Sequence, residues 1–319
     1  MSESDLPPEL ERRGVHFLTI TAREDGQRLD NFLFRRYSHI PKSRLYQMLR
    51  KGEVRCNKKR VAASHRLQLN DQLRLPPLYQ KTVRPPAVPP YWLERVRRAV
   101  VYEDERFLLV NKPAGLAVHG GSGNDYGLME ALQTLRGPDA VLLGHRIDRD
   151  TSGLLVLAKS RAALLDFQEQ LKAGTVEKHY LCLVHGHWPA ARQEVRLKLA
   201  KIQSEDGDRM VVHPEGKEAL SYFTVAARYE EATLLSVRIA TGRTHQIRLS
   251  VAHCGHPLAG DDKYGDREFN KTLKRRGYDG MWLHAQRLCF QRDAGQLLGL
   301  AVPPPPDALA LLERLTALA

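Results

Sequence analysis

The chain lacks any apolar run near the ~20 residues that a membrane-spanning helix needs. Residues 1–13 are polar and acidic, so we expect neither a secretory signal nor a membrane partner. Cysteine is scarce: the four cysteines are far apart and form no CxxC pair. This spacing favours reduced thiols in a cytoplasmic protein over a disulfide framework.

Motifs for the common cofactors and for a serine hydrolase are also missing. The KPAG segment at residues 112–115 lacks the order of a phosphate-binding loop, and Ser152 stands in no GxSxG elbow. The HCGH segment at residues 253–256 crowds its candidate ligands at a helix end, where adjacent side chains rarely converge on one ion. We therefore expect no metal and no small-molecule cofactor.

Positive charge, by contrast, is abundant and uneven. The 319 residues carry a net charge of +12, and residues 28–60 hold eleven lysines and arginines against two acids, or +9. These cations follow an ordered pattern instead of a tail. The pattern favours a polyanion partner, most simply nucleic acid, over the alternative of an ordinary solvated face.

The length suggests about two domains. Residues 1–14 lack periodicity and are expected to be disordered. Apolar residues at helical spacing then predict two helices; they are Leu29, Phe32, Leu33 and Tyr37 in the first, and Leu45, Met48 and Leu49 in the second. Pro41 begins the second helix and Gly52 caps its end, and short alternating strands follow.

Basic side chains off these apolar stripes can face a phosphate backbone. The cations that we expect to bind RNA are Lys42, Arg44, Arg50, Lys51, Arg55, Lys58 and Lys59. The segments GQRLDNFL, PKSRLYQMLRKGEVRCNKK and LNDQLRLP resemble the S4-like RNA-binding domain. The resemblance implies that residues 15–76 form such a domain.

Proline-rich residues 77–95 predict a stiff linker without a core of its own. Residues 96–319 are long enough for one further domain. Its expected strands do not alternate strictly with helices, and a hairpin over residues 222–240 implies antiparallel pairing. We therefore predict an α+β fold with a mixed, mainly antiparallel, curved sheet.

The run GHRIDRDTSG at residues 144–153 sets Asp148 among basic residues, directly before a buried strand. A charged carboxylate held in this way is a candidate nucleophile or base. Tyr180 on a further strand and Arg248 on a helix after a glycine turn are its candidate partners. Each of these residues alone also has an ordinary structural explanation. Asp148 with Asp150 suggests a glycosidase pair, but two acids so close on one loop are expected to diverge.

The segments LVNKPAGLAVHGGSG, HRIDRDTSGLLVLAK, EKHYLCLVHG and TGRTHQIR, with the later LHA triplet, resemble the RluA-type pseudouridine synthases in order and spacing. The resemblance covers nearly the whole chain. It implies isomerisation of uridine to pseudouridine, with Asp148 as nucleophile and Tyr180 as the active-site tyrosine. It also implies that Arg248 is the basic partner of Asp148 and that Arg146 intercalates in the RNA.

On this basis the expected substrate is large-subunit (23S) ribosomal RNA or a pre-ribosomal particle, in the cytoplasm. The chain has no heptads, so we expect a monomer. Two alternatives stay open: a pseudouridine synthase acting on transfer RNA, and a non-catalytic ribosome-associated RNA-binding protein. The second would not need Asp148 to face Arg248.

Overall fold

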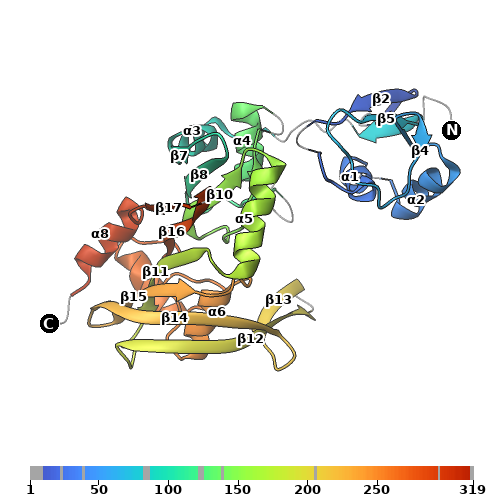
Figure 1. The fold of residues 1–319 in the computed structure, drawn as a ribbon. Coiled ribbons are helices and arrows are strands. Elements are labelled where there is room, and N and C mark those ends of the chain that lie inside the picture. Colours follow the sequence, from blue (N-terminus) through green and yellow to red (C-terminus); the bar gives the residue numbers. More distant parts are fainter. Residues whose placement is uncertain are drawn as a thin grey trace. The chain divides into compact units, whose positions relative to one another are not determined.

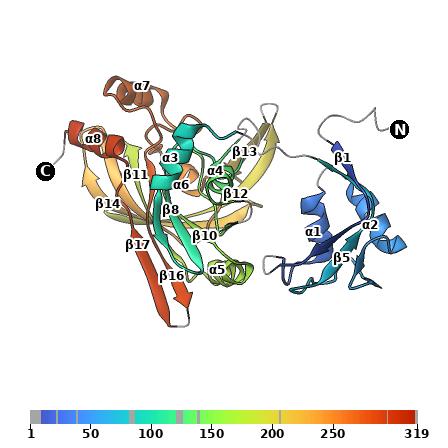
Figure 2. The same cartoon turned by 90° about the horizontal axis from the view of Figure 1, so that it is seen from above.

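The computed structural model describes residues 10–21, 24–37, 40–81, 87–120, 126–137, 140–204, 207–293 and 295–316. The chain divides into two compact units, Met1–Pro85 and Pro86–Ala319 (Figure 1, Figure 2). Within the described ranges, no helix combines the length and the apolar character needed to cross a bilayer.

In the first unit, two helices share a core with a small antiparallel sheet of order β2-β5-β3-β4 (Figure 1). Its elements are β1 (Leu10–Arg13), β2 (His16–Thr19), α1 (Leu29–Arg36), α2 (Lys42–Lys51), β3 (Arg55–Cys56), β4 (Lys59–Arg60), β5 (Gln72–Leu75) and β6 (Leu78–Lys81). The apolar faces predicted for α1 and α2 are both buried. Gly52 ends α2 in the left-handed region at φ 69°, and its N–H donates to the carbonyl of Leu49.

Two segments differ from the sequence prediction. β1 pairs with β6, so residues 10–13 of the expected disordered N-terminus form a ladder with residues 78–81 of the expected linker. No proline interrupts residues 78–81, so their backbone N–H groups are able to pair. Pro90 begins α3 (Pro90–Arg98), because proline fits the first turn of a helix. Residues 1–9 and 82–86 lie outside the described residues.

The second unit is built on one large sheet of order β13-β12-β14-β15-β11-β16-β10-β8-β7, with β17 on β16 and β9 on β10. Its strands are β7 (Val100–Glu103), β8 (Phe107–Lys112), β9 (Leu142–Leu143), β10 (Ser152–Ala158), β11 (Glu177–His185), β12 (Arg192–Ser204), β13 (Gly207–Val212), β14 (Lys217–Arg228), β15 (Ala232–Ile239), β16 (Leu283–Asp293) and β17 (Gln296–Ala301). After α3 its helices are α4 (Leu128–Arg136), α5 (Arg161–Ala173), α6 (Gln246–His253), α7 (Arg267–Arg275) and α8 (Pro306–Arg314).

These strands pair antiparallel except where β10 meets β16. The predicted mixed, mainly antiparallel α+β fold is therefore confirmed, and the predicted hairpin is β14 with β15.

Strand β10 fixes the loop that precedes it. All seven of its residues are buried, so it is held on both faces. At its start Gly153 adopts φ 109°, and a Cβ there would lie 2.6 Å from the backbone nitrogen of Ala285 on β16. Only glycine allows the two strands to approach this closely. The end of the Asp148 loop is thereby anchored to the centre of the sheet.

Candidate active site

A large open cleft in the second unit is lined by the three segments that the sequence predicts to form an active site. Its lining includes Asp148 from the loop between β9 and β10, Tyr180 from β11 and Arg248 from α6, with the exposed Arg146 beside them. The cleft volume is about 2400 Å³. Sites for small ligands measure about 300–1,000 Å³. The cleft therefore suits a segment of a polymer.

Arg248 connects two carboxylates. Its Nη1 donates to Oδ2 of Asp148 at 3.2 Å. Its other side donates to Asp261, from Nε to Oδ2 at 2.7 Å and from Nη2 to Oδ1 at 2.8 Å. The Asp261 side chain has no exposed surface, whereas that of Asp148 is 25% exposed. Asp261 thus holds the guanidinium from behind in a bidentate pair, and Asp148 keeps a face open to the cleft.

The charges of this group support one another. Burial opposes the charge of Arg248, but the hydrogen bonds and charge of Asp261, together with the charge of Asp148, outweigh it and raise the pKa of Arg248. Burial likewise opposes the charge of Asp261, but the guanidinium and the backbone N–H groups of Lys263 and Tyr264 lower its pKa overall. Arg248 and Asp261 therefore stay charged at neutral pH.

Tyr180 is 7% exposed and lines the same cleft. Burial, and then the negative charge of Asp148, raise the pKa of Tyr180. The phenol is accordingly neutral at physiological pH. It offers a flat ring and a hydroxyl to a ligand, and no phenolate.

His245 lies at the start of α6 in a strained backbone conformation, with φ 56° and ψ 23°. Its Nδ1 lies 2.9 Å from the hydroxyl of Tyr264, and its Nε2 lies 3.9 Å from Oδ2 of Asp148. Burial is the main cause that lowers the pKa of His245. At neutral pH this residue is therefore an uncharged neighbour of Asp148.

Lys112 holds the Asp148 loop from inside the protein. Its side chain is completely buried. Its Nζ donates to the carbonyls of Pro113, Leu116 and Arg149, each at 2.8 Å. Burial lowers the pKa of Lys112 to about 7. Because Arg149 directly follows Asp148, these bonds fix the backbone beside the candidate nucleophile.

The sequence motifs identified Asp148, Tyr180 and Arg248, and the structure brings all three to one cleft. No role in the site was predicted for Asp261, His245 or Lys112. Lys112 and His245 lie inside the motif segments LVNKPAGLAVHGGSG and TGRTHQIR, so their place in these motifs was the available signal, whereas Asp261 lies outside every such segment.

Apart from Arg146, the cations predicted to bind RNA belong to the first unit. Those of α2 and of the strands after it are all exposed; they are Lys42, Arg44, Arg50, Lys51, Arg55, Lys58 and Lys59. Arg44 also lies 3.7 Å from the carboxylate of Glu53. Their exposure is compatible with phosphate contacts, which stay a prediction.

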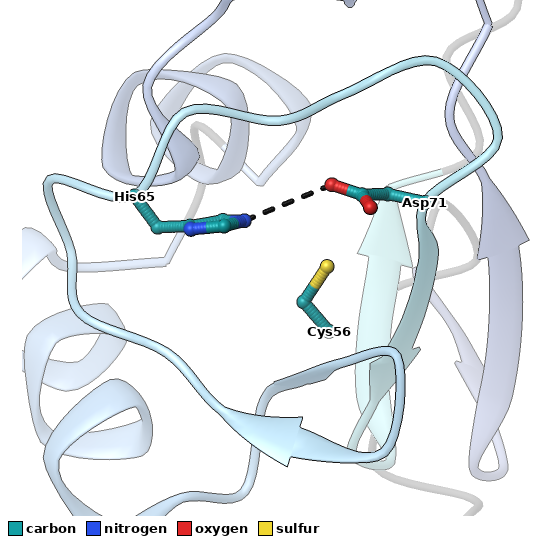
Figure 3. Close-up of side chains that lie close together, drawn as sticks. All are labelled: Cys56, His65 and Asp71. Atoms are coloured by element: carbon teal, nitrogen blue, oxygen red, sulfur yellow. Dashed lines mark ion pairs between the residues drawn. The ribbon is translucent and has the colours of Figure 1, made fainter.

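Cys56, His65 and Asp71 point toward one another in the first unit (Figure 3). Their potential ligand atoms all lie within 4.8 Å of one another. Asp71 already accepts hydrogen bonds from Nδ2 of Asn57 at 2.7 Å and from the N–H of Gln68 at 2.8 Å. Burial, and then the contact with Asp71, raise the pKa of the Cys56 thiol to about 12. The protonated thiol therefore joins a hydrogen-bonded cluster that supports the loop before β5.

Comparison with known proteins identifies both units. A family model described as RNA pseudouridylate synthase matches residues 106–254, and one described as S4 domain matches residues 27–73. The chain is 43% identical over 306 residues to ribosomal large subunit pseudouridine synthase C of Pasteurella multocida, which covers 94% of each chain. It is 42% identical over 314 residues to the protein of that name from Escherichia coli, covering 96% of this chain and 98% of the relative.

Solved structures show the same fold for the larger unit. Human RNA pseudouridylate synthase domain containing 4 superposes with a TM-score of 0.58 at 23% identity, over 70% of this chain and 95% of that one. Human RNA pseudouridylate synthase domain containing 1 gives a TM-score of 0.57 at 24% identity, over 69% of this chain and 88% of that one.

Proposed function

The chain belongs to the RNA pseudouridylate synthase family, and from this premise we propose that it isomerises uridine to pseudouridine in large-subunit ribosomal RNA, with Asp148 as nucleophile. The substrate follows the names of the relatives in Pasteurella multocida and Escherichia coli, which match nearly full length. We propose that it acts as a monomer in the cytoplasm, where ribosomal RNA is available.

One observation carries the role of Asp148. Its carboxylate faces an open cleft while Arg248, itself locked by Asp261, directs an N–H at one of its oxygens. A held, partly exposed anion of this kind suits attack on an electrophilic carbon of the substrate. In the isomerisation the C1′–N1 bond breaks and a C1′–C5 bond forms, and the proton on C5 leaves as N1 gains one. The same carboxylate serves attack on the ribose or on the uracil ring.

The other residues of the cleft have roles that follow from their environment. The neutral ring of Tyr180 stacks on the uracil, and its hydroxyl forms a hydrogen bond to the base. A uridine inside a helix cannot reach Asp148, so it is everted, at a cost of a few kcal/mol. Arg146 is exposed beside the cleft, where its guanidinium fills the vacated position in the RNA stack. The exposed cations of the S4 domain contribute phosphate contacts that offset this cost.

The test is pseudouridine formation in transcribed large-subunit ribosomal RNA, mapped by mass spectrometry. Asp148→Asn is expected to lower the rate at least about 10³-fold. Asp150→Asn is the matched control, because Asp150 lies on the same loop but pairs with Arg149 at 2.9 Å. We expect this control to stay active.

Three results would contradict the proposal. Turnover by Asp148→Asn would exclude the nucleophile. Conversion of transfer RNA but not of ribosomal RNA would move the substrate to transfer RNA. RNA binding by the wild type without any conversion would favour a binding protein.

A further inference from the structure

Lys178 is a partly buried cation in the catalytic cleft. It lies on β11 two residues before Tyr180, so the two side chains share one face of the strand, and both line the cleft. A Cβ at Gly242 would lie 3.7 Å from the Lys178 Nζ. The ammonium is therefore held beside the turn that leads into α6.

Two titratable neighbours act on this ammonium electrostatically, and they are the positive Arg243 and the neutral His145. Burial, and then the charge of Arg243, lower the pKa of Lys178. The guanidinium of Arg243 is itself exposed at the cleft and donates from Nε to the carbonyl of Glu218 at 3.0 Å. Burial also lowers the pKa of nearby His145 to about 4, so this ring is neutral. Its Nε2 accepts the N–H of Val156 at 3.2 Å.

The described part of the chain supplies no acidic partner for Lys178. Among the residues that the structure describes, none forms an ion pair or a hydrogen bond with its ammonium. A partly buried cation without a partner is unfavourable unless a ligand supplies the opposite charge. By contrast, Lys112 in the same cleft uses all three of its donors on carbonyls. The free donors of Lys178 thus point to an anionic part of the substrate.

Resting on the proposed function, we propose that Lys178 binds the phosphodiester adjoining the everted uridine and so fixes its ribose over Asp148. In a nucleotide the phosphate is one ribose away from the base. In the cleft, Lys178 is the next side chain along the same face of β11 from Tyr180, whose ring stacks on the base. Lysine serves well here, because a phosphate accepts a point charge from many directions. Arg243, at the same end of the cleft, adds to the positive potential.

The alternative role is stabilisation of the negative charge that uracil gains when its bond to ribose breaks. The two roles differ in what they change. A phosphate contact acts on binding and depends strongly on salt, since each neutralised phosphate releases counterions. A contact to the leaving base acts on the maximal rate and leaves the salt dependence of binding unchanged.

The experiment compares wild type, Lys178→Met, Lys178→Arg and Lys271→Met. Lys271 lies on α7 outside the cleft lining, so its variant controls for the loss of one positive charge. The RNA is a synthetic hairpin that carries a uridine mapped in ribosomal RNA as converted by the wild type. Single-turnover rates are measured over RNA and KCl concentration. If the wild type converts no uridine, the proposed function fails at this first step, before Lys178 is tested.

We expect Lys178→Met to lower kcat/KM about 10- to 100-fold, mainly through KM, with partial recovery in Lys178→Arg. The slope of log binding constant against log salt should fall by about 0.7–0.9. Replacing single phosphates beside the uridine by neutral methylphosphonates should impair the wild type at one position and have no further effect on Lys178→Met. The Lys271→Met control should match wild type.

Two outcomes would overturn the proposal. The first is a methylphosphonate effect of equal size in wild type and Lys178→Met at every position, because the lysine would then contact none of these phosphates. The second is a loss confined to the maximal rate with an unchanged salt slope, which would assign Lys178 to the leaving base.

Discussion

Asp261→Asn should destabilise the second unit while leaving its shape intact. The substitution keeps the side-chain volume but removes the charge that faces Arg248, and it turns an amide toward guanidinium donors at 2.7 and 2.8 Å. The Asp261 side chain is 0% exposed and that of Arg248 is 9% exposed, so water screens the loss poorly. Breaking a buried pair in this way costs about 3–5 kcal/mol.

The matched variant is Asp148→Asn. Asp148 is 25% exposed and meets Arg248 through one bond of 3.2 Å, so its loss should cost about 1 kcal/mol or less. Urea unfolding followed by tryptophan fluorescence separates the two. Trp92, Trp188 and Trp282 are the chain's three tryptophans, and all lie in the second unit. Asp261→Asn should shift the midpoint by at least about 1 M.

The pH dependence gives an independent check. The pKa of Asp261 is lowered in the folded protein, so its stabilisation is present above its unfolded value of about 4 and is lost as pH falls through the folded value. The gap in unfolding free energy between wild type and Asp261→Asn should therefore narrow in acid. The buried pair would be refuted as a source of stability if Asp261→Asn unfolded at the same urea concentration as the wild type. It would also be refuted if the difference in unfolding free energy between the two proteins did not change with pH.

Three further predictions concern the supports of the site. Lys112→Met removes three hydrogen bonds and leaves the carbonyls of Pro113 and Leu116 without that donor, while the carbonyl of Arg149 keeps the N–H of Gly115 at 3.0 Å. The variant should cost about 3 kcal/mol in urea unfolding. Burial lowers the pKa of Lys112 to about 7, so between pH 7 and 10 the Lys112 amine is protonated in the unfolded chain but mostly neutral in the folded protein. The free energy of unfolding of the wild type should therefore rise from pH 7 toward 10. The same rise in Lys112→Met would contradict this explanation. Gly153→Ala should lower thermal stability by about 3 kcal/mol or more, since its Cβ meets the Ala285 backbone, and an unchanged melting curve would exclude the close approach. The RNA dissociation constant of Tyr180→Phe should stay within about threefold of that of the wild type, whereas that of Tyr180→Ala should not, because only Phe keeps the aromatic ring. The pH–rate profile of the wild type should show no ionisation of the phenol below about pH 10.

Much of the fold was predictable because its signals are local. The helical stripes of the first unit, the cap at Gly52 and the buried strand β10 all follow from periodicity over a few residues. The pairing of β1 with β6 was not predictable. Its two strands are short, one lies beside prolines, and they are separated by more than sixty residues. The sequence of neither segment alone indicates which other segment it pairs with.

The candidate site shows the same division in chemical terms. Asp148 stands on a polar loop directly before the buried strand β10, so residue type and context predicted it, whereas the roles of Tyr180 on β11 and Arg248 on α6 were predicted from the resemblance of their motifs to a family. Asp261 reaches Asp148 through Arg248, thirteen residues earlier: both its carboxylate oxygens accept hydrogen bonds from that guanidinium, and Asp261 is not part of the cleft lining.

Lys112 presents a similar case. In the sequence it resembles a surface lysine before a proline turn, yet it is fully buried, and its ammonium joins the nearby carbonyls of Pro113 and Leu116 to the carbonyl of the distant Arg149. What aims the nucleophile is therefore a set of buried charges whose partners the folded chain alone brings within reach. For the same reason, a variant of Asp261 or Lys112 should impair catalysis without touching the RNA.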